Sequence, residues 1–97
     1  GRIQLGFDVP KAGLYEIEMA FCKSFDYAVI ETLIDDKPIG QRLDTFSPNI
    51  VHTGPIKFGR VELTAGPHVL EFRVVGKNND SKGYFMGLDY LELLPVK

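Results

Sequence analysis

The stretch Tyr15-Glu16-Ile17-Glu18-Met19-Ala20-Phe21 decides the fold class. Large apolar side chains occupy every second position, with glutamate or alanine between them, so an extended chain here has one strongly apolar face. A period of two is the pattern of a β-strand whose one side lies in a core and whose other side lies in water. The stretch therefore predicts an amphipathic strand in a layered all-β domain.

The same alternation continues on both sides of this stretch. Apolar and polar residues alternate over 3–9, 56–63 and 70–74, and a shorter strand is predicted over 39–43. Turn-forming Pro, Gly, Asn and Asp residues separate these segments, and no window has a helical period. About seven or eight short strands, with a turn about every eight to twelve residues, predict an antiparallel β-sandwich of the jelly-roll type.

Three features depart from simple alternation. Between Phe25 and Ile34 the apolar residues fall on both parities, which indicates a strand that is covered on both faces or contains a bulge. The segment from Asp44 to Pro55 contains two prolines and is predicted to be the longest irregular piece. Gly59 interrupts a strand pattern and predicts a bulge or a close approach of another group.

Bulk properties narrow the class of protein. A chain of 97 residues predicts one domain, and its net charge of -2 gives no electrostatic reason to expect nucleic acid or an anionic membrane as partner. No apolar run is long enough to cross a bilayer as a helix. The strand pattern begins within two residues of Gly1, so we expect residues 1–97 to be one β-sandwich module of a longer protein. Cys22 is the only cysteine, which excludes an internal disulfide.

The last strand carries one acid within an apolar pattern. Asp89 shares its parity with Leu91 and Leu93, so we expect its carboxylate to point toward the core. A carboxylate in that position needs hydrogen bonds, a cation or a metal, because burying it unpaired costs several kcal/mol. Two roles stay open for Asp89. It either anchors loop amides or an arginine at the end of the sandwich, or it serves as a calcium ligand among other oxygens.

Catalytic signatures are missing from the sequence. His52 and His68 stand alone, without a nucleophile at motif spacing, and the chain has no phosphate-binding loop and no zinc signature. Glycoside hydrolysis needs two carboxyl groups facing each other across the scissile bond, and no feature of the sequence calls for such a pair. We therefore expect no enzymatic activity.

Four segments in order carry a family resemblance: Phe7–Tyr15, Leu33–Gly40, Leu63–Leu70 and Gly87–Leu91. Together they resemble the galactose-binding-like jelly rolls, especially the carbohydrate-binding modules of families 6 and 35, of the kind attached to bacterial glycoside-hydrolase-type proteins. The resemblance covers nearly the whole chain. It implies a non-catalytic module of an exported protein, extracellular or periplasmic, with a calcium site. Such modules commonly bind sugar on a loop Trp or Tyr, and this chain has no Trp.

The loop before the last strand is the candidate glycan site. Sugar recognition uses an aromatic face for the C–H side of the ring and amides or carboxylates for the hydroxyls. The resemblance implies that this loop lies beside the loop at 23–27, so we expect sugar contacts from Tyr27, Asn78, Asn79 and Tyr84.

Two plainer interpretations stay open for these residues and for the module. Asn and Asp are ordinary turn residues, and both tyrosines fit the edge of a core. The module would then be a structural or assembly domain that packs against a catalytic domain or another subunit through Phe46, Ile50 and Val51.

Overall fold

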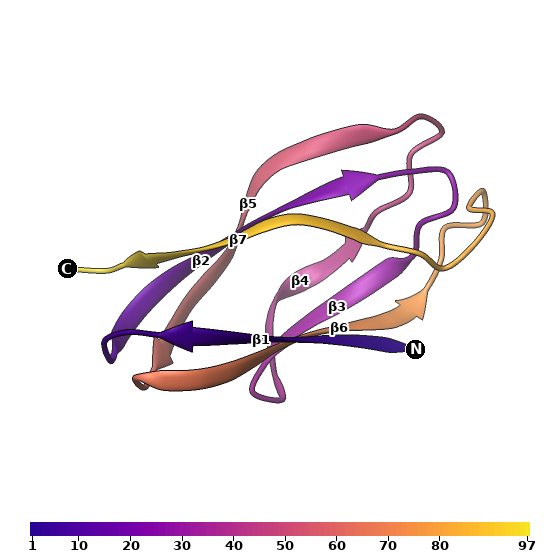
Figure 1. Ribbon diagram of the computed structural model, residues 1–97. Coiled ribbons are helices and arrows are strands. Elements are labelled where there is room, and N and C mark those ends of the chain that lie inside the picture. Colours follow the sequence, from indigo (N-terminus) through magenta and orange to yellow (C-terminus); the bar gives the residue numbers. More distant parts are fainter.

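The chain folds into two antiparallel sheets without any helix (Figure 1). The computed structural model describes all of residues 1–97. One sheet has the strand order β1-β6-β3-β4 and the other has the order β5-β2-β7. The strands are β1 (Arg2–Val9), β2 (Gly13–Lys23), β3 (Val29–Ile34), β4 (Lys37–Asp44), β5 (Val51–Leu63), β6 (Gly66–Gly76) and β7 (Gly87–Pro95). The all-β antiparallel sandwich predicted by the sequence is confirmed, and no helix of the chain could span a membrane.

Strand β2 is the centre of the three-stranded sheet and supplies much of the core. Its alternate residues Ile17, Met19 and Phe21 are fully buried. The Phe21 ring packs edge to face against the Phe72 ring, which belongs to the opposite sheet, and the two ring centroids are 5.7 Å apart. Such aromatic pairs add about 0.5–1.5 kcal/mol to the free energy of apolar burial. The apolar side chains whose alternation predicted this strand are therefore the ones that pack against the opposite sheet.

Strand β3 is the inner strand between β6 and β4, and both of its faces are covered. Leu33 and Ile34 are consecutive and point to opposite faces, yet they are only 1% and 2% exposed. The prediction of a strand covered on both faces is confirmed. The strand begins at Val29, and the residues before it form the loop that connects the two sheets.

Strand β5 is longer than the sequence predicted. The irregular segment was expected to reach Pro55, but the strand begins at Val51. Because β5 is an edge strand, a proline without an N–H is tolerated in it, and Gly54 absorbs a register shift with φ of 69°. The bulge predicted at Gly59 is confirmed by a second register shift and a φ of 97°.

A buried histidine closes the end of the sandwich that is distant from the long loops. His68 Nδ1 lies 2.5 Å from the Asp35 carboxylate, and its Nε2 lies 2.7 Å from the Thr64 carbonyl oxygen. Both ring nitrogens therefore face acceptors, which only the doubly protonated imidazolium satisfies. The Phe7 ring stacks on this cation at 5.6 Å, as in a cation–π contact.

The contact between His68 and Asp35 shifts the pKa values of both side chains. The hydrogen bond to Asp35, followed by the bond to Thr64, raises the pKa of His68 above 6.5. Burial by itself raises the pKa of Asp35, but the hydrogen bonds from His68 and the Val69 amide outweigh burial and lower it. The pairing therefore favours the charged form of both side chains.

Stability should fall with rising pH because of this histidine. Its folded-state pKa lies above 6.5, so its contribution is complete below pH 6.5 and is lost as the pH rises through the folded value. We expect His68→Gln to lower the free energy of unfolding by about 1 kcal/mol at pH 6. Urea unfolding between pH 6 and pH 9 measures this, with His52→Gln as the exposed control. A difference between wild type and His68→Gln that grows with pH would contradict the assignment.

Candidate functional site

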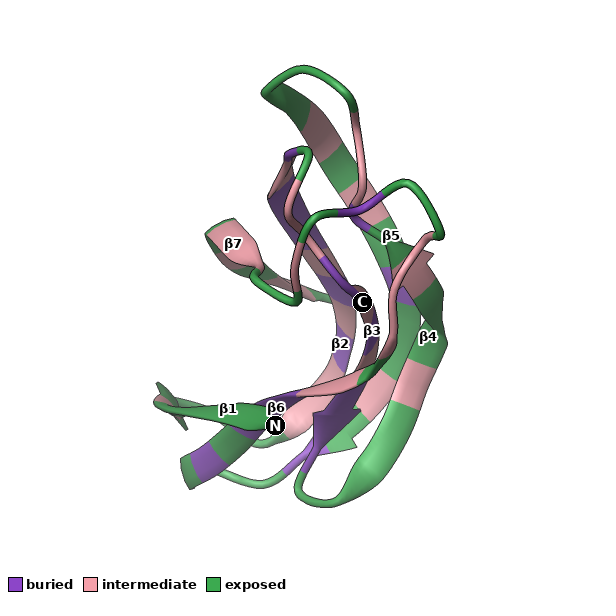
Figure 2. Cartoon of the chain, turned by 90° about the vertical axis from the view of Figure 1, so that its right-hand side faces the viewer, coloured by how far each residue is buried: buried purple, intermediate pink, exposed green.

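Three connections meet at the end of the sandwich opposite His68. They are the β2–β3 loop at 24–28, the β4–β5 segment at 45–50 and the β6–β7 loop at 77–86, which we call the loop end. Figure 1 shows them together beyond the ends of the sheets, and Figure 2 looks onto this side of the molecule. Most of their residues are exposed or half-buried, in contrast to the buried residues of the inner strands β2, β3 and β6.

Backbone hydrogen bonds fasten the β6–β7 loop to the β2–β3 loop. The Lys82 amide donates to the Phe25 carbonyl at 2.8 Å, and the Phe85 amide donates to the Asp26 carbonyl at 3.0 Å. In return, the Ala28 amide donates to the Phe85 carbonyl at 2.7 Å. These bonds link residues that are more than fifty positions apart in sequence, so the two loops form one unit.

Two buried hydroxyl groups complete this unit. Ser81, only 5% exposed, donates to the Tyr27 carbonyl at 2.7 Å and lies 3.0 Å from the Gly83 carbonyl. Thr45 is fully buried and donates to the Ala28 carbonyl at 2.5 Å, which attaches the β4–β5 segment. The Ser81 hydroxyl is thus a donor to the Tyr27 carbonyl, and the Ala28 carbonyl accepts from both the hydroxyl and the amide of Thr45.

Three aromatic side chains project from these loops into solvent. Phe25 is 48% exposed, Tyr84 is 57% exposed and Phe85 is 65% exposed. The two phenylalanines carry backbone groups of the hydrogen-bonded unit, so their rings are held on a fixed base. The sequence predicted only Tyr84 among these three. The available signal was that Phe25 and Phe85 lie beside polar loop residues, outside any regular alternation.

An open hollow lies beside Tyr84. Its volume is about 600 Å³, and it is lined by Gly1, Tyr84 and the end of β6 at 74–76. Tyr84 is therefore the predicted site residue that combines high exposure with a neighbouring concave surface.

Tyr27 lies differently from Tyr84, because it is half-buried against the sheet. Its hydroxyl oxygen would lie 3.1 Å from a Cβ added at Gly87, so the ring uses the space that this glycine leaves free. Burial raises the pKa of Tyr27, and the nearby Cys22 and Asp26 raise it further. The side chain packs against the end of β7 rather than projecting with the three exposed aromatic rings.

The two predicted asparagines have different surroundings. Asn78 Nδ2 donates to Asp44 Oδ2 at 2.9 Å, and its Oδ1 accepts from the Asp80 amide at 3.0 Å. Both polar atoms of Asn78 are thus engaged in shaping the loop. Asn79 is exposed and lies next to them at the tip of the loop.

The expectation that Asp89 points toward the core is wrong. In the pairing of β7 with β2, Leu88 lies opposite Phe21 and Tyr90 lies opposite Ala20, so Asp89 is an extra residue. This bulge turns Asp89 and Tyr90 both outward, while Leu88 on one side still packs against the core. Alternation alone assigned Asp89 to the inner face, because it assumed an unbroken period of two.

Asp89 instead forms a pair on the outer face of the three-stranded sheet. Its Oδ2 lies 2.9 Å from His52 Nδ1, and the two side chains are 34% and 73% exposed. The residues around Asp89 do not fit calcium, which requires six to eight oxygen ligands. The partner of Asp89 is a nitrogen, and the chain has no group of three or more His, Cys, Asp or Glu side chains placed to hold a metal.

Comparisons with known proteins bear on the fold of the chain. No family model and no curated protein sequence matches the chain. Among solved structures it is similar to part of a Paenibacillus xanthan lyase, with a TM-score of 0.82 and 23% identity over 98% of this chain and 9% of the lyase. It is also similar to part of a Podospora anserina GH26-CBM35 β-(1,4)-mannanase, with a TM-score of 0.63 and 13% identity over 99% of this chain and 19% of the mannanase.

Both neighbours are carbohydrate-active enzymes by name, and the chain spans less than a fifth of either one. At these identities the similarity shows a shared fold. It does not single out binding-module family 6 or 35.

Removing the Ser81 hydroxyl should loosen the loop end. Ser81→Ala leaves the buried Tyr27 carbonyl without its donor, so we expect a loss of about 1–2 kcal/mol in the free energy of unfolding. The amides of Lys82 and Phe85 should also exchange faster with deuterium. Asn79→Ala is the matched control, since Asn79 is exposed in the same loop. An equal effect of the two substitutions would show that Ser81 does not hold the loop.

Calcium should leave the stability of the chain unchanged. Asp89 and His52 offer too few oxygens for this ion, so thermal melts with added calcium and with a chelator should superimpose. Bound calcium at a hundred times its Kd would add about 2.7 kcal/mol, which a melt would show. A calcium-dependent rise in Tm that Asp89→Asn abolishes would restore the ligand role.

Proposed function

We propose that this chain is a non-catalytic accessory module of an exported carbohydrate-active protein, extracellular or periplasmic, that binds glycan through its loop end. The observation that carries the proposal is the group of three exposed aromatic side chains, Phe25, Tyr84 and Phe85, on hydrogen-bonded loops. The two structural neighbours, both carbohydrate-active enzymes, supply the context.

The chemistry of the loop end suits a sugar chain. Aromatic rings cover the C–H faces of pyranoses, while exposed polar groups such as Asn79 and Lys82 reach their hydroxyls. The hydrogen bonds between the loops hold these groups in place before binding, so little conformational entropy is lost when a ligand arrives. A fixed, open surface of this kind favours weak and repeated contact with a polysaccharide.

The arrangement of acids and histidines supports a binding role rather than a catalytic one. Asp44, at the end of β4 beside the β6–β7 loop, has both carboxylate oxygens bound, one to Asn78 and one to the Phe46 amide. The two histidine–aspartate pairs lie on the outer sheet face and at the opposite end. In neither pair is a serine or cysteine hydrogen-bonded to the histidine, so the nucleophile of a hydrolytic triad is missing.

A second candidate function uses the same end as a protein contact. Ile50 and Val51 are 68% and 41% exposed, and they extend the apolar character of the three aromatic residues toward β5. Exposed apolar groups that gather on one side are typical of protein interfaces. On this alternative the module packs its loop end against a catalytic domain or another subunit and binds no glycan.

Replacing the aromatic residues one at a time tests the glycan role. Phe25→Ala, Tyr84→Ala and Phe85→Ala should each weaken retention in affinity gels by about two- to ten-fold, the effect of losing one aromatic contact. Xanthan and β-1,4-mannan are the first polysaccharides to try, because the neighbouring enzymes are named for them. Tyr90→Ala is the matched control, since Tyr90 is 42% exposed on the outer face of β7.

Two results would reject the glycan role. One is the absence of retention by any polysaccharide, and the other is equal retention of the wild type and all three loop variants. In either case, sedimentation of the isolated chain with Ile50→Ser as comparison tests the protein contact. Self-association that the substitution abolishes would support that contact, and a monomer at all concentrations would count against it.

A further inference from the structure

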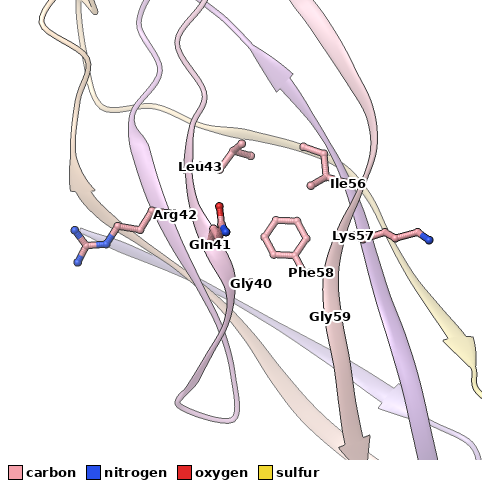
Figure 3. A pocket seen from close by; sticks show the side chains of 8 residues that line it. All are labelled: Gly40, Gln41, Arg42, Leu43, Ile56, Lys57, Phe58 and Gly59. Carbon is pink, nitrogen blue, oxygen red and sulfur yellow. The ribbon is translucent and has the colours of Figure 1, made fainter.

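A cleft lies at the flank of the sandwich, apart from the loop end. It is formed where the edge strands of the two sheets approach each other, with 40–43 of β4 on one side and 56–59 of β5 on the other (Figure 3). Its volume is about 500 Å³, within the range of small-molecule sites. Figure 2 also places β4 and β5 side by side along this flank.

Bulges in both edge strands shape the cleft. In β4, residues 40–42 lie between Ile39 and Leu43, whose partners in β3 are separated by a single residue. In β5, Lys57 and Gly59 lie opposite consecutive residues of β2, which leaves Phe58 as the extra residue. Glycines with positive φ at both bulges, 61° at Gly40 and 97° at Gly59, permit these bends.

The cleft is short, because it spans only residues 40–43 of β4 and 56–59 of β5. Within it the two strands come close, since a Cβ added at Gly40 would lie 2.5 Å from the Phe58 ring and 3.2 Å from its Cα. A cleft of this length suits a compact ligand.

The lining combines an apolar floor with polar walls. Leu43 and Ile56 point toward each other across the gap, and the Phe58 ring lies between the two strands (Figure 3). The exposed Gln41 also lines the cleft, and its amide offers both donors and an acceptor. The facing edges of β4 and β5 have no strand partner, so their backbone groups are available as well.

The charged side chains at the cleft turn away from it. Figure 3 shows Arg42 and Lys57 pointing outward on opposite sides. Arg42 lies 3.5 Å from Glu31 and Lys57 lies 3.6 Å from Glu16, so each cation is directed to a partner on its own sheet. No ionisable side chain faces the interior, which favours a neutral ligand over an anion or a cation.

We propose that this cleft is a second binding site, which takes one uncharged sugar ring. The ring places its C–H face on Leu43 and Ile56 and its hydroxyls against the Gln41 amide and the free strand edges. The choice of a sugar over another neutral ring rests on the proposed function, whereas the geometry of the cleft is independent of the loop end.

Nuclear magnetic resonance titration tests the site directly. Methyl glycosides of glucose, mannose, galactose and xylose are added to the ¹⁵N-labelled chain, with glucuronate as the charged comparison. At least one neutral glycoside should shift the amides of 40–43 and 56–59 saturably, with a Kd on the order of 1–10 mM for so small a ligand. Glucuronate should bind more weakly.

Variants separate this site from the loop end. Gln41→Leu keeps the size of an exposed side chain and should weaken binding about ten-fold, and Ile56→Phe should block it by filling the cleft. Arg42→Ala, Lys57→Ala and Tyr84→Ala should leave the shifts unchanged. Binding that persists in both cleft variants, shifts confined to 77–86, or no shift with any neutral glycoside would overturn the proposal. The amide shifts of 40–43 and 56–59 are measured independently of the loop-end variants in affinity gels, so failure of this site and failure of the proposed function can be told apart.

Discussion

Extra residues in the edge strands determine where side chains outside the core point. In a regular strand the direction of each side chain follows from its position, because every second side chain faces inward. In β7 the extra residue Asp89 turns two consecutive side chains outward, and the strand resumes with Leu91 packed against the core. In β5 the extra residue Phe58 places its ring in the core, while Lys57 stays on the outer face. The inner strands β2, β3 and β6 carry most of the core, so the edge strands can bend with little loss of apolar burial.

The loop end depends instead on hydrogen bonds between loops that are distant in sequence. Exposed aromatic residues on a mobile loop would lose conformational freedom on binding, and that loss would offset part of the contact energy. Here the carbonyl groups of Phe25 and Phe85 each accept a bond from the other loop, so the backbone beneath the rings is already ordered. The buried hydroxyl of Ser81 adds a third link between the two loops. Rigidity of the backbone and exposure of the rings therefore occur in the same residues.

The sequence predicts the parts of this structure that follow from a regular period. The alternation from Tyr15 to Phe21 predicted a core strand, and apolar residues on both parities predicted the covered strand β3. The orientation of Asp89 was predicted wrongly, because its bulge contains no glycine or proline to mark it. Gly59 did mark a bulge, since only glycine adopts its φ of 97° without strain. Pro55 led to a wrong strand boundary for the opposite reason. Proline breaks inner strands, but it is tolerated in an edge strand such as β5.

The candidate sites were less predictable than the fold, because exposure depends on tertiary placement. Tyr27 and Tyr84 lie in similar polar surroundings in the sequence, yet one covers Gly87 and the other is 57% exposed beside a hollow. The β4–β5 cleft needs two strands from different sheets, and no local pattern relates Gly40 to Phe58. At this flank the edges of the two sheets approach each other without pairing. The bulges that bend both edge strands here are therefore the features that shape the cleft.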